Sequence, residues 1–419
     1  MIRTALLPLL ALALPTTITA TGGSIRGSFS SIPRQLEDEY HWSQVGADIF
    51  GVNNDDGAGN SVAINRAGNI IAIGARNADS STSGTNAGHV RVFVLDYRSR
   101  TWFQLGDDIE GEATMDQSGQ EVTLNAIGNI VGVSAPFNDN SGGLNSGHAR
   151  VYKYNIGKAK WEQMGDPAGP AGSEDLDGTD RSERMESIAL SGDGLRCVIG
   201  ASGFPYGSFL GRARVFDYDE DNNEWVQKGG PLFGTKVGDR FGGSISISDD
   251  GSRIAVGTYA QDCNLEDLND NCGSARVFEF SDEEDDWVQL GTTMMGQGYK
   301  SHFGSDLCFS GDGNFLAVGA NRHGGYTGQV QVYKYDGDWT QVGNSIDGVA
   351  SADMAGGSVS MNTDGTILAV GAWGHDVEDI GANNGQVRVF QYVQETNTWE
   401  QVGLALEGLM AGDSFGWCK

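Results

Sequence analysis

The 419-residue sequence is poor in basic residues, with 27 Lys and Arg against 56 Asp and Glu. The resulting formal net charge of −29 repels nucleic acid and anionic membranes. We therefore expect no nucleic-acid partner and no insertion of this chain into a membrane. Such a charge keeps a protein soluble, and it favours cations and basic partners.

The sequence also lacks any long amphipathic helical pattern and has only 8 prolines. Glycine is abundant, with 63 residues, but it shows no collagen-like period. Glycine at this level, mixed with Val, Ile and aromatic residues, is typical of many short strands joined by tight turns. A helical or collagenous fold is therefore excluded.

The few cysteines do not form a metal-binding pattern. Cys263 and Cys272 are nine positions apart in one acidic loop, and we predict a disulfide between them. Cys197 and Cys308 fall within predicted strands, where a free cysteine behaves as a small apolar residue. Cys418 lies at the terminus, and the spacing of the five offers no zinc site.

The N-terminal residues indicate export. A positive start at Arg3, an apolar run from Ala5 to Leu14 and a small residue at Ala20 are typical of a secretory signal peptide over 1–20. The apolar run is too short to span a membrane. Residues 21–40 are polar and without periodicity, as in a flexible lead-in. We expect a secreted or cell-surface protein.

From Trp42 onward the chain is a tandem repeat. A Trp-x-Gln-x-Gly signature occurs seven times, at intervals of 60, 59, 64, 62, 52 and 60 residues. Its tryptophans are Trp42, Trp102, Trp161, Trp225, Trp287, Trp339 and Trp399. Periods of this size indicate solenoids, propellers or arrays.

Each period contains four strand-like runs and no helix. An alternating run such as 61–65 leads through a tight turn, often Asp-Gly, to a continuously apolar run ending in Gly-Ala, such as 71–75. A third run of the Arg-Val-Phe type and the Trp strand complete the unit. Four antiparallel strands per repeat predict the blade of a β-propeller over 41–419.

The two ends of the repeat region bear on the number of blades. No three strands precede the signature at Trp42, and Gly412–Gly416 matches the beginning of a blade at Gly238–Gly242. We predict an all-β propeller with six complete blades and a partial seventh, as in a truncated seven-bladed ring. A six-bladed ring with one spare strand is the alternative.

The runs Phe241-Gly242 to Val256-Gly257 and Phe303-Gly304 to Val318-Gly319-Ala320 resemble the FG-GAP repeat. That repeat forms the seven-bladed propeller at the N-terminal head of integrin α chains. The resemblance covers Trp42 to Lys419 and implies the propeller fold; it is much less specific for function. Its calcium loop is replaced here by short turns such as 191–194, so the family's metal sites are not carried over.

Acidic residues gather instead in the connections between blades. Glu174, Asp175, Asp177 and Asp180 form the best candidate for a metal site, and calcium is the cation that such oxygen ligands suit. The other interpretation is solvated loop charge, because no loop has the full ligand spacing.

Catalytic signals are scarce. No nucleophile elbow or phosphate-binding glycine loop is present. His89 and His148 share one repeat position that other repeats fill with unrelated residues, and the remaining histidines are scattered. We therefore predict no catalytic residues, no certain cofactor and no enzyme.

These patterns favour a secreted binding, adhesion or scaffolding propeller whose partner is an extracellular protein, a polysaccharide or a matrix, assisted by cations. One alternative is a propeller-fold hydrolase or lyase that acts on glycans through loop carboxylates. The other is a structural matrix protein without a specific ligand.

Overall fold

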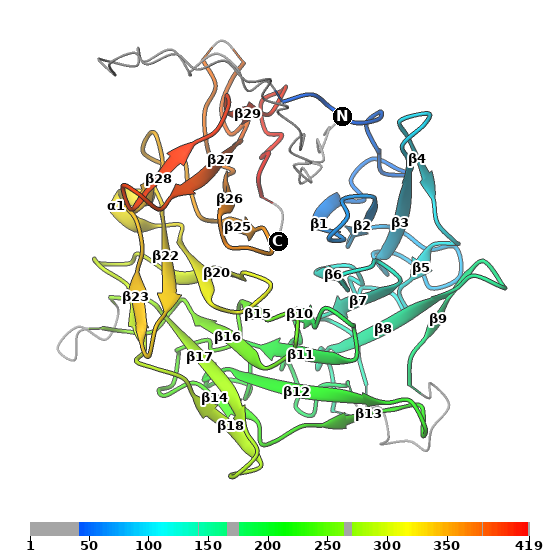
Figure 1. Ribbon diagram of the computed structural model, residues 1–419. Helices are drawn as coiled ribbons and strands as arrows, with labels where there is room; N and C mark the ends of the chain where they lie inside the picture. The colour runs from blue at the N-terminus through cyan, green and yellow to red at the C-terminus, as the bar shows by residue number, and fades with distance from the viewer. Residues whose placement is uncertain (1–41, 141, 166–175, 264–269, 379, 418–419) are drawn as a thin grey trace, which may run out of the picture.

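The computed structural model describes residues 42–417, apart from 141, 166–175, 264–269 and 379. It is a six-bladed β-propeller, in which each blade is an antiparallel sheet of four strands in chain order (Figure 1). The predicted signal peptide and lead-in lie outside the described residues, as do Glu174, Asp175 and Cys418.

In each blade the strands run in sequence order from the axis to the outside of the ring (Figure 1). The first strands are β1 (Ala58–Ile64), β6 (Val122–Leu124), β10 (Ser187–Leu190), β15 (Ile245–Ile247), β20 (Phe303–Phe309) and β25 (Ser358–Met361). The second strands are β2 (Ile70–Ala75), β7 (Ile130–Ala135), β11 (Arg196–Ala201), β16 (Arg253–Thr258), β21 (Phe315–Ala320) and β26 (Ile367–Ala372).

The third strands are β3 (His89–Asp96), β8 (His148–Asn155), β12 (Arg212–Asp219), β17 (Ser274–Ser281), β22 (Gln329–Tyr335) and β27 (Gln386–Val393). The fourth strands are β4 (Thr101–Gln104), β9 (Lys160–Gln163), β13 (Glu224–Gln227), β18 (Asp286–Gln289), β23 (Trp339–Gln341) and β28 (Thr398–Gln401). Short strands that pair with the third strand follow in five blades: β5 (Ile109–Glu110), β14 (Leu232–Phe233), β19 (Met294–Met295), β24 (Ile346–Asp347) and β29 (Leu406–Glu407). A single helical turn, α1 (His323–Tyr326), precedes β22.

The core consists of apolar layers between neighbouring blades. Ala72, Val90 and Val92 of blade 1 pack against Val131 and Val133 of blade 2, and equivalent residues pack at the next four junctions. The second strand is buried on both faces, which is why its sequence is continuously apolar.

The glycine before the terminal alanine of the second strand allows neighbouring blades to meet backbone to backbone. A Cβ atom on Gly74 would lie 2.2 Å from the main-chain oxygen of Gly119 in the next blade. A larger residue at this position would therefore push the two backbones apart.

The repeated tryptophans link the blades at the outer rim. Each indole nitrogen donates a hydrogen bond to a main-chain oxygen in or just after the preceding signature, as from Trp102 to Val45 at 3.0 Å and from Trp287 to Lys228 at 2.8 Å. Trp42 makes the corresponding bond to Leu404 at 2.9 Å. Residues 42–46 nevertheless form no strand, so the predicted partial seventh blade is not shown.

At the end of the ring where the first hairpins turn, the turns are joined to one another. Main-chain hydrogen bonds run from Ala126 to Gly192, from Gly192 to Asp249 and from Asp249 to Gly311, at 2.7–2.9 Å. The guanidinium of Arg66 in blade 1 forms an ion pair with Asp249 in blade 4, three blades away around the ring. This contact spans the axis at that end of the ring.

Candidate functional site

The opposite end of the axis is bordered by two residue positions in every blade. One position directly follows the second strand, and antiparallel pairing places the other at the same end. The second position directly precedes a serine in four blades and an acidic residue in two: Ser61, Glu121, Ser187, Ser244, Asp306 and Ser358. We call the twelve residues at these two positions and Trp417, which has the second position after blade 6, the inner rim. They are Asn60, Arg76, Gln120, Pro136, Glu186, Ser202, Gly243, Tyr259, Ser305, Asn321, Gly357, Trp373 and Trp417.

The inner rim differs in kind from the buried layers. The buried positions repeat the same residue types from blade to blade, whereas the rim carries a single guanidinium, a single carboxylate and a single phenol. Glycine and aromatic residues are paired there: a Cβ on Gly243 would lie 2.7 Å from Tyr259, and one on Gly357 2.9 Å from Trp373. The rim therefore accommodates a different side chain in each blade on a repeated backbone.

Between blades 1 and 2 the rim presents hydrogen-bond donors. Nη1 of Arg76 donates to Oε1 of Gln120 at 2.9 Å, and Nδ2 of Asn60 donates to the main-chain oxygen of Gln120 at 3.0 Å. These contacts hold a cationic group and an amide side by side on one arc of the rim.

Blade 3 supplies the carboxylate. The hydroxyl of Ser202 donates to Oε1 of Glu186, and the main-chain nitrogen of Glu186 donates to the oxygen of Gly200 at 3.2 Å. Among the described residues, Oε2 of this half-buried carboxylate has no hydrogen-bond partner. Glu186 is therefore held in place with one oxygen available to a water molecule or a ligand.

Blades 4 and 5 contribute a phenol beside an imidazole. The ring centroids of Tyr259 and His302 are 5.6 Å apart. Burial lowers the pKa of His302 to about 4, and the positive charges of Arg322 and Lys300 act in the same direction. This imidazole is therefore uncharged at neutral pH, and it is a weaker base than a free histidine.

At blade 6 the rim is aromatic. The indole rings of Trp373 and Trp417 have centroids 4.3 Å apart with an interplanar angle of 69°. The Trp417 side chain is 46 % exposed, which leaves an apolar surface open at this side of the rim. Exposed aromatic faces of this kind suit the apolar face of a flat or cyclic ligand.

The metal site predicted from the sequence is only partly described. Oδ1 of Asp177 accepts a hydrogen bond from Nη1 of Arg150 at 2.7 Å, and Glu112 also contacts this arginine. The main-chain nitrogen of Asp180 donates to Glu183. Because Asp177 already faces a guanidinium, it and Asp180 do not form a carboxylate cage, and the calcium site stays a prediction.

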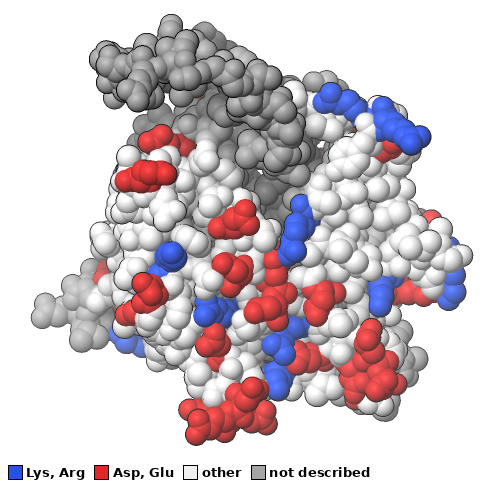
Figure 2. All heavy atoms as spheres, in the orientation of Figure 1, with Lys and Arg blue, Asp and Glu red and all other residues white. Residues whose placement is uncertain are grey.

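Many other acidic residues of the connections have a structural role. Asp116, Asp239, Asp353 and Asp413 are buried, and each accepts hydrogen bonds from main-chain nitrogens three or four residues earlier. Elsewhere the acidic side chains are scattered, and Figure 2 shows them as separate groups with Lys and Arg between several of them. The acidity of the sequence therefore does not mark one site.

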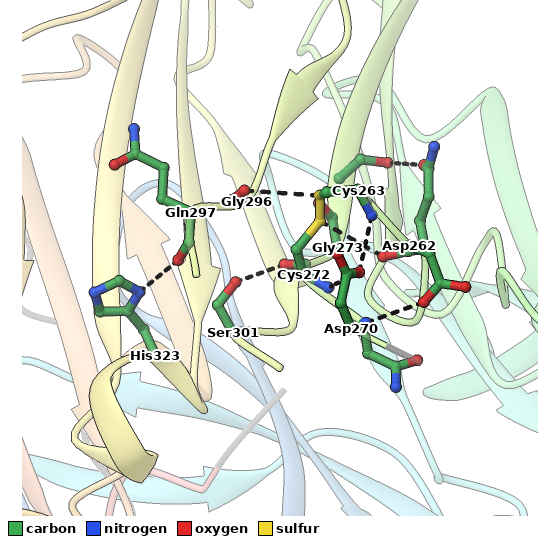
Figure 3. Close-up of a disulfide and its surroundings, with 12 residues drawn as sticks. Asp262, Cys263, Asp270, Cys272, Gly273, Gly296, Gln297, Ser301 and His323 are labelled. Atoms are coloured by element: carbon green, nitrogen blue, oxygen red, sulfur yellow. Dashed lines mark hydrogen bonds between the residues drawn. A yellow bond between two sulfur atoms is a disulfide. The ribbon is translucent and has the colours of Figure 1, made fainter. Parts of the chain in front are cut away.

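The predicted disulfide between Cys263 and Cys272 is present, with Cα atoms 5.8 Å apart (Figure 3). Asp270 lies beside it and accepts hydrogen bonds from the main-chain nitrogens of both cysteines, at 2.9 and 3.4 Å. Within the described part of the chain, these three side chains are the one group close enough to share a metal ion. Disulfide formation removes the two thiolates as metal ligands, so this group stabilises the loop.

The sequence interpretation missed the inner rim, because no motif marks it. The signal that could have found it is positional: a superposition of the repeats shows that the residue after Gly-Ala changes in every blade. Only the structure places these positions around the axis.

Comparison with known proteins bears on the fold. No protein-family model matches the sequence, and no curated protein is significantly similar to it. Among solved structures, a protein described as a 6-phosphogluconolactonase from Bacteroides uniformis has a TM-score of 0.55 and 12 % identity, with 84 % of this chain and 86 % of that chain covered.

Two further propellers are similar. A protein from Bacteroides fragilis with the same description has a TM-score of 0.52 and 12 % identity, with 86 % of each chain covered. The periplasmic gluconolactonase PpgL of Pseudomonas aeruginosa has a TM-score of 0.50 and 14 % identity, with 84 % of this chain and 85 % of that chain covered. At such identities the likeness establishes the propeller fold alone.

These neighbours correct the functional prediction. We expected a binding or scaffolding module and no enzyme, because no catalytic motif recurs in the sequence. The similar propellers instead carry the names of lactone hydrolases, and the inner rim holds a carboxylate that repeat analysis did not reveal. Both observations agree better with the hydrolase alternative.

The disulfide and the periplasmic neighbour fit a protein located outside the cytoplasm. In the described part of the chain, no helix has the length and apolar character needed to cross a membrane.

Proposed function

We propose that this chain is a hydrolase that opens a cyclic ester of a sugar acid at the inner rim, with Glu186 as the general base. The observation that carries the proposal is the position of Glu186, the one carboxylate of the rim, with Oε1 held by Ser202 and Oε2 unpartnered among the described residues. The names of the similar propellers support the reaction class.

The chemistry follows from the groups on the rim. Oε2 of Glu186 takes a proton from a water molecule, and the oxygen of that water forms a bond to the ester carbonyl carbon. The bond from this carbon to the ring oxygen then breaks, and the ring oxygen takes up the proton. Arg76 and Gln120 provide N–H groups of the kind that stabilise the negative charge developing on the carbonyl oxygen.

The charge of the protein favours an uncharged substrate over a phosphorylated one. A net charge of −29 repels anions at long range, and Arg76 is the single cation among the inner-rim residues. The apolar face of a sugar-derived ring fits the exposed surface of Trp417 beside Trp373.

The proposal includes the cellular setting. We infer a secreted protein whose ligand is derived from carbohydrate, in keeping with the apolar N-terminal run over 5–14 and the disulfide. The resemblance to FG-GAP repeats stays a proposal about ancestry, and it carries no part of the mechanism.

A direct comparison of substrates tests this proposal. Proton release is followed with a pH indicator on glucono-1,5-lactone and on its 6-phosphate at equal concentration, with subtraction of the spontaneous rate. We expect turnover of the uncharged lactone with the higher kcat/KM. Equal rates with and without the protein on both lactones would overturn the proposed reaction.

A further inference from the structure

Cations gather on one side of the ring, at the end that holds the inner rim. The ten residues before each first strand and the loop after each second strand meet at this end, because these strands are antiparallel. In blades 3 to 5 (β10 to β23 in Figure 1) these segments carry six Lys and Arg residues, whereas those of blades 6, 1 and 2 carry only Arg76. We call the six the cationic arc: Arg181, Arg184, Lys236, Arg240, Lys300 and Arg322.

The side chains of the cationic arc are not neutralised by groups of the described chain. Within the residues that the structure describes, none of the six forms an ion pair or donates a side-chain hydrogen bond. Other arginines near this end do so: Arg150 pairs with Asp177, and Arg91 donates to the main-chain oxygen of Phe50. The positive charges of the arc are therefore available to a ligand.

Aromatic rings hold most of these cations in place. In five of the six, the charged group lies over a ring, within the range of a cation–π interaction. The pairs and their distances to the ring centroid are Arg240 and Phe209 at 4.7 Å, Lys300 and Tyr299 at 4.9 Å, Arg184 and Phe137 at 5.1 Å, Arg322 and Tyr326 at 5.6 Å, and Arg181 and Tyr206 at 5.7 Å. Such contacts orient a cation and leave its N–H groups free to donate.

The fold does not require these cations. Arg184 and Arg240 occupy one repeat position, the residue before the first inner contact of each blade, and both have a positive φ, of 54° and 58°. Gly57, Gln117 and Met354 have this position in blades 1, 2 and 6, also with a positive φ. Because the same backbone forms with an uncharged residue, the arginines need a reason other than folding.

The segments of the cationic arc form one continuous surface. The main-chain nitrogen of Arg240 donates to the oxygen of Phe209 at 3.0 Å, which joins the entry to blade 4 to the loop of blade 3. The main-chain nitrogen of Arg322 donates to the oxygen of Ser301 at 3.2 Å and joins two segments of blade 5 in the same way. A long ligand can therefore contact several of the cations at once.

Exposed phenol rings lie among the cations. The side chains of Tyr206, Tyr299 and Tyr326 are 61 %, 64 % and 44 % exposed. Aromatic surface of this kind contacts the apolar face of a sugar ring, and the phenol hydroxyl adds a hydrogen-bonding group. The arc thus alternates groups that suit a carboxylate with groups that suit a sugar.

We propose that the cationic arc binds a polysaccharide whose sugar rings carry carboxylates, on a surface beside the inner rim and separate from it. Guanidinium groups pair with carboxylates through two parallel hydrogen bonds, and the tyrosines contact the rings between them. The bound polymer holds the protein on an acidic polysaccharide. This binding does not depend on the reaction proposed for Glu186.

The net charge of −29 is compatible with this ligand. The acidic hairpin between β17 and β18 lies at the opposite end of the ring, and salt screens charges beyond about 8 Å at physiological ionic strength. A polymer also gains from several contacts at once, which a single small anion does not. Duplex DNA carries one charge per about 1.7 Å and is repelled more strongly than a chain with one carboxylate per sugar ring.

Titration of the full chain with polygalacturonate tests the proposal. Isothermal titration calorimetry compares the natural sequence with a triple variant of the arc, Arg184→Gln, Arg240→Gln and Arg322→Gln. We expect the Kd of the variant to rise about tenfold or more, because three carboxylate contacts are lost. Its Tm should stay nearly unchanged, since none of the three pairs with a carboxylate in the described chain.

A second triple variant controls for net charge. Arg98→Gln, Lys158→Gln and Lys160→Gln remove the same number of positive charges from hairpins at the opposite end of the ring. We expect its Kd for polygalacturonate to change by less than about twofold. Absence of binding by the natural sequence, or an equal loss of affinity in both triple variants, would overturn the proposal.

Other polymers test the class of ligand. Dextran has sugar rings without charge, and poly-glutamate has carboxylates without sugar rings. We expect no binding of dextran and a Kd for poly-glutamate and for single-stranded DNA that is about fivefold or more above that for polygalacturonate. Equal affinity for polygalacturonate and for either of the other two anions would show that the arc recognises charge alone, and it would refute the assignment to a polysaccharide.

Discussion

The hydroxyl of Ser202 donates a hydrogen bond to Oε1 of Glu186, across the ends of the two innermost strands of blade 3. This contact fixes the carboxylate in one orientation at the inner rim. It also makes the serine a positioning residue, since its own oxygen has no part in the proposed bond changes.

Replacement of Ser202 by Ala should release the carboxylate without removing it. We expect kcat for lactone opening to fall about tenfold and KM to change little, because the base loses its orientation and the substrate contacts remain. Steady-state kinetics with a parallel Tm measurement separate this effect from unfolding. A loss of activity that is accompanied by a large fall in Tm would instead indicate that Ser202 only stabilises the fold.

His302 makes the stability dependent on pH. Its folded pKa of about 4 lies below the value of 6.5 in the unfolded chain, so the unfolded state binds more protons between these values. Stability should therefore fall as the pH is lowered from 6.5 towards 4. Thermal unfolding followed by circular dichroism should show a shallower decline for His302→Gln, and an identical slope in both proteins would refute the assignment.

The close contact at Gly74 predicts a large effect of one methyl group. Gly74→Ala places Cβ against the backbone of Gly119 and should lower the free energy of unfolding by about 2–4 kcal/mol. Gly157→Ala is the matched control, because a Cβ there meets only Oδ1 of Asn155 at 3.4 Å. Chemical denaturation that gives equal stabilities for the two variants would disprove the steric account.

The disulfide bond between Cys263 and Cys272 should stabilise the fold. Joint replacement of both cysteines by Ser should cost about 2–3 kcal/mol, since the bond closes a short loop whose unfolded freedom it restricts. Calorimetry with and without a reducing agent measures this. The reducing agent should lower the Tm of the natural sequence and leave that of the double variant unchanged; a Tm of the natural sequence insensitive to reduction would argue against the bond.

The sequence predicts the blades well because their determinants are local and repeated. The spacing of Trp102, Trp161 and the other signature residues, and the Gly-Ala ends of the second strands, give the four strands and their order. The disulfide also follows from sequence, since Cys263 and Cys272 share one loop.

The site could not be predicted in the same way. Glu186 and Tyr259 belong to different blades, and closure of the ring places both on the rim. The sequence predicted a metal site in the acidic run that includes Asp177, although that residue forms an ion pair with Arg150. Residues that recur in every repeat form the strands and turns of the fold. The proposed chemistry depends on inner-rim positions that carry a different residue from blade to blade.

The central claim is that Glu186 is the base of a lactone hydrolase, and one substitution tests it most directly. Glu186→Gln keeps the size of the side chain and removes its capacity to accept a proton. Glu224→Gln makes the same change on the exposed outer strand β13. With proton release from glucono-1,5-lactone as the readout, we predict that kcat falls by about 100-fold or more in the first variant, with Tm unchanged, and stays constant in the second. A Glu186→Gln protein that retains full activity would contradict the account.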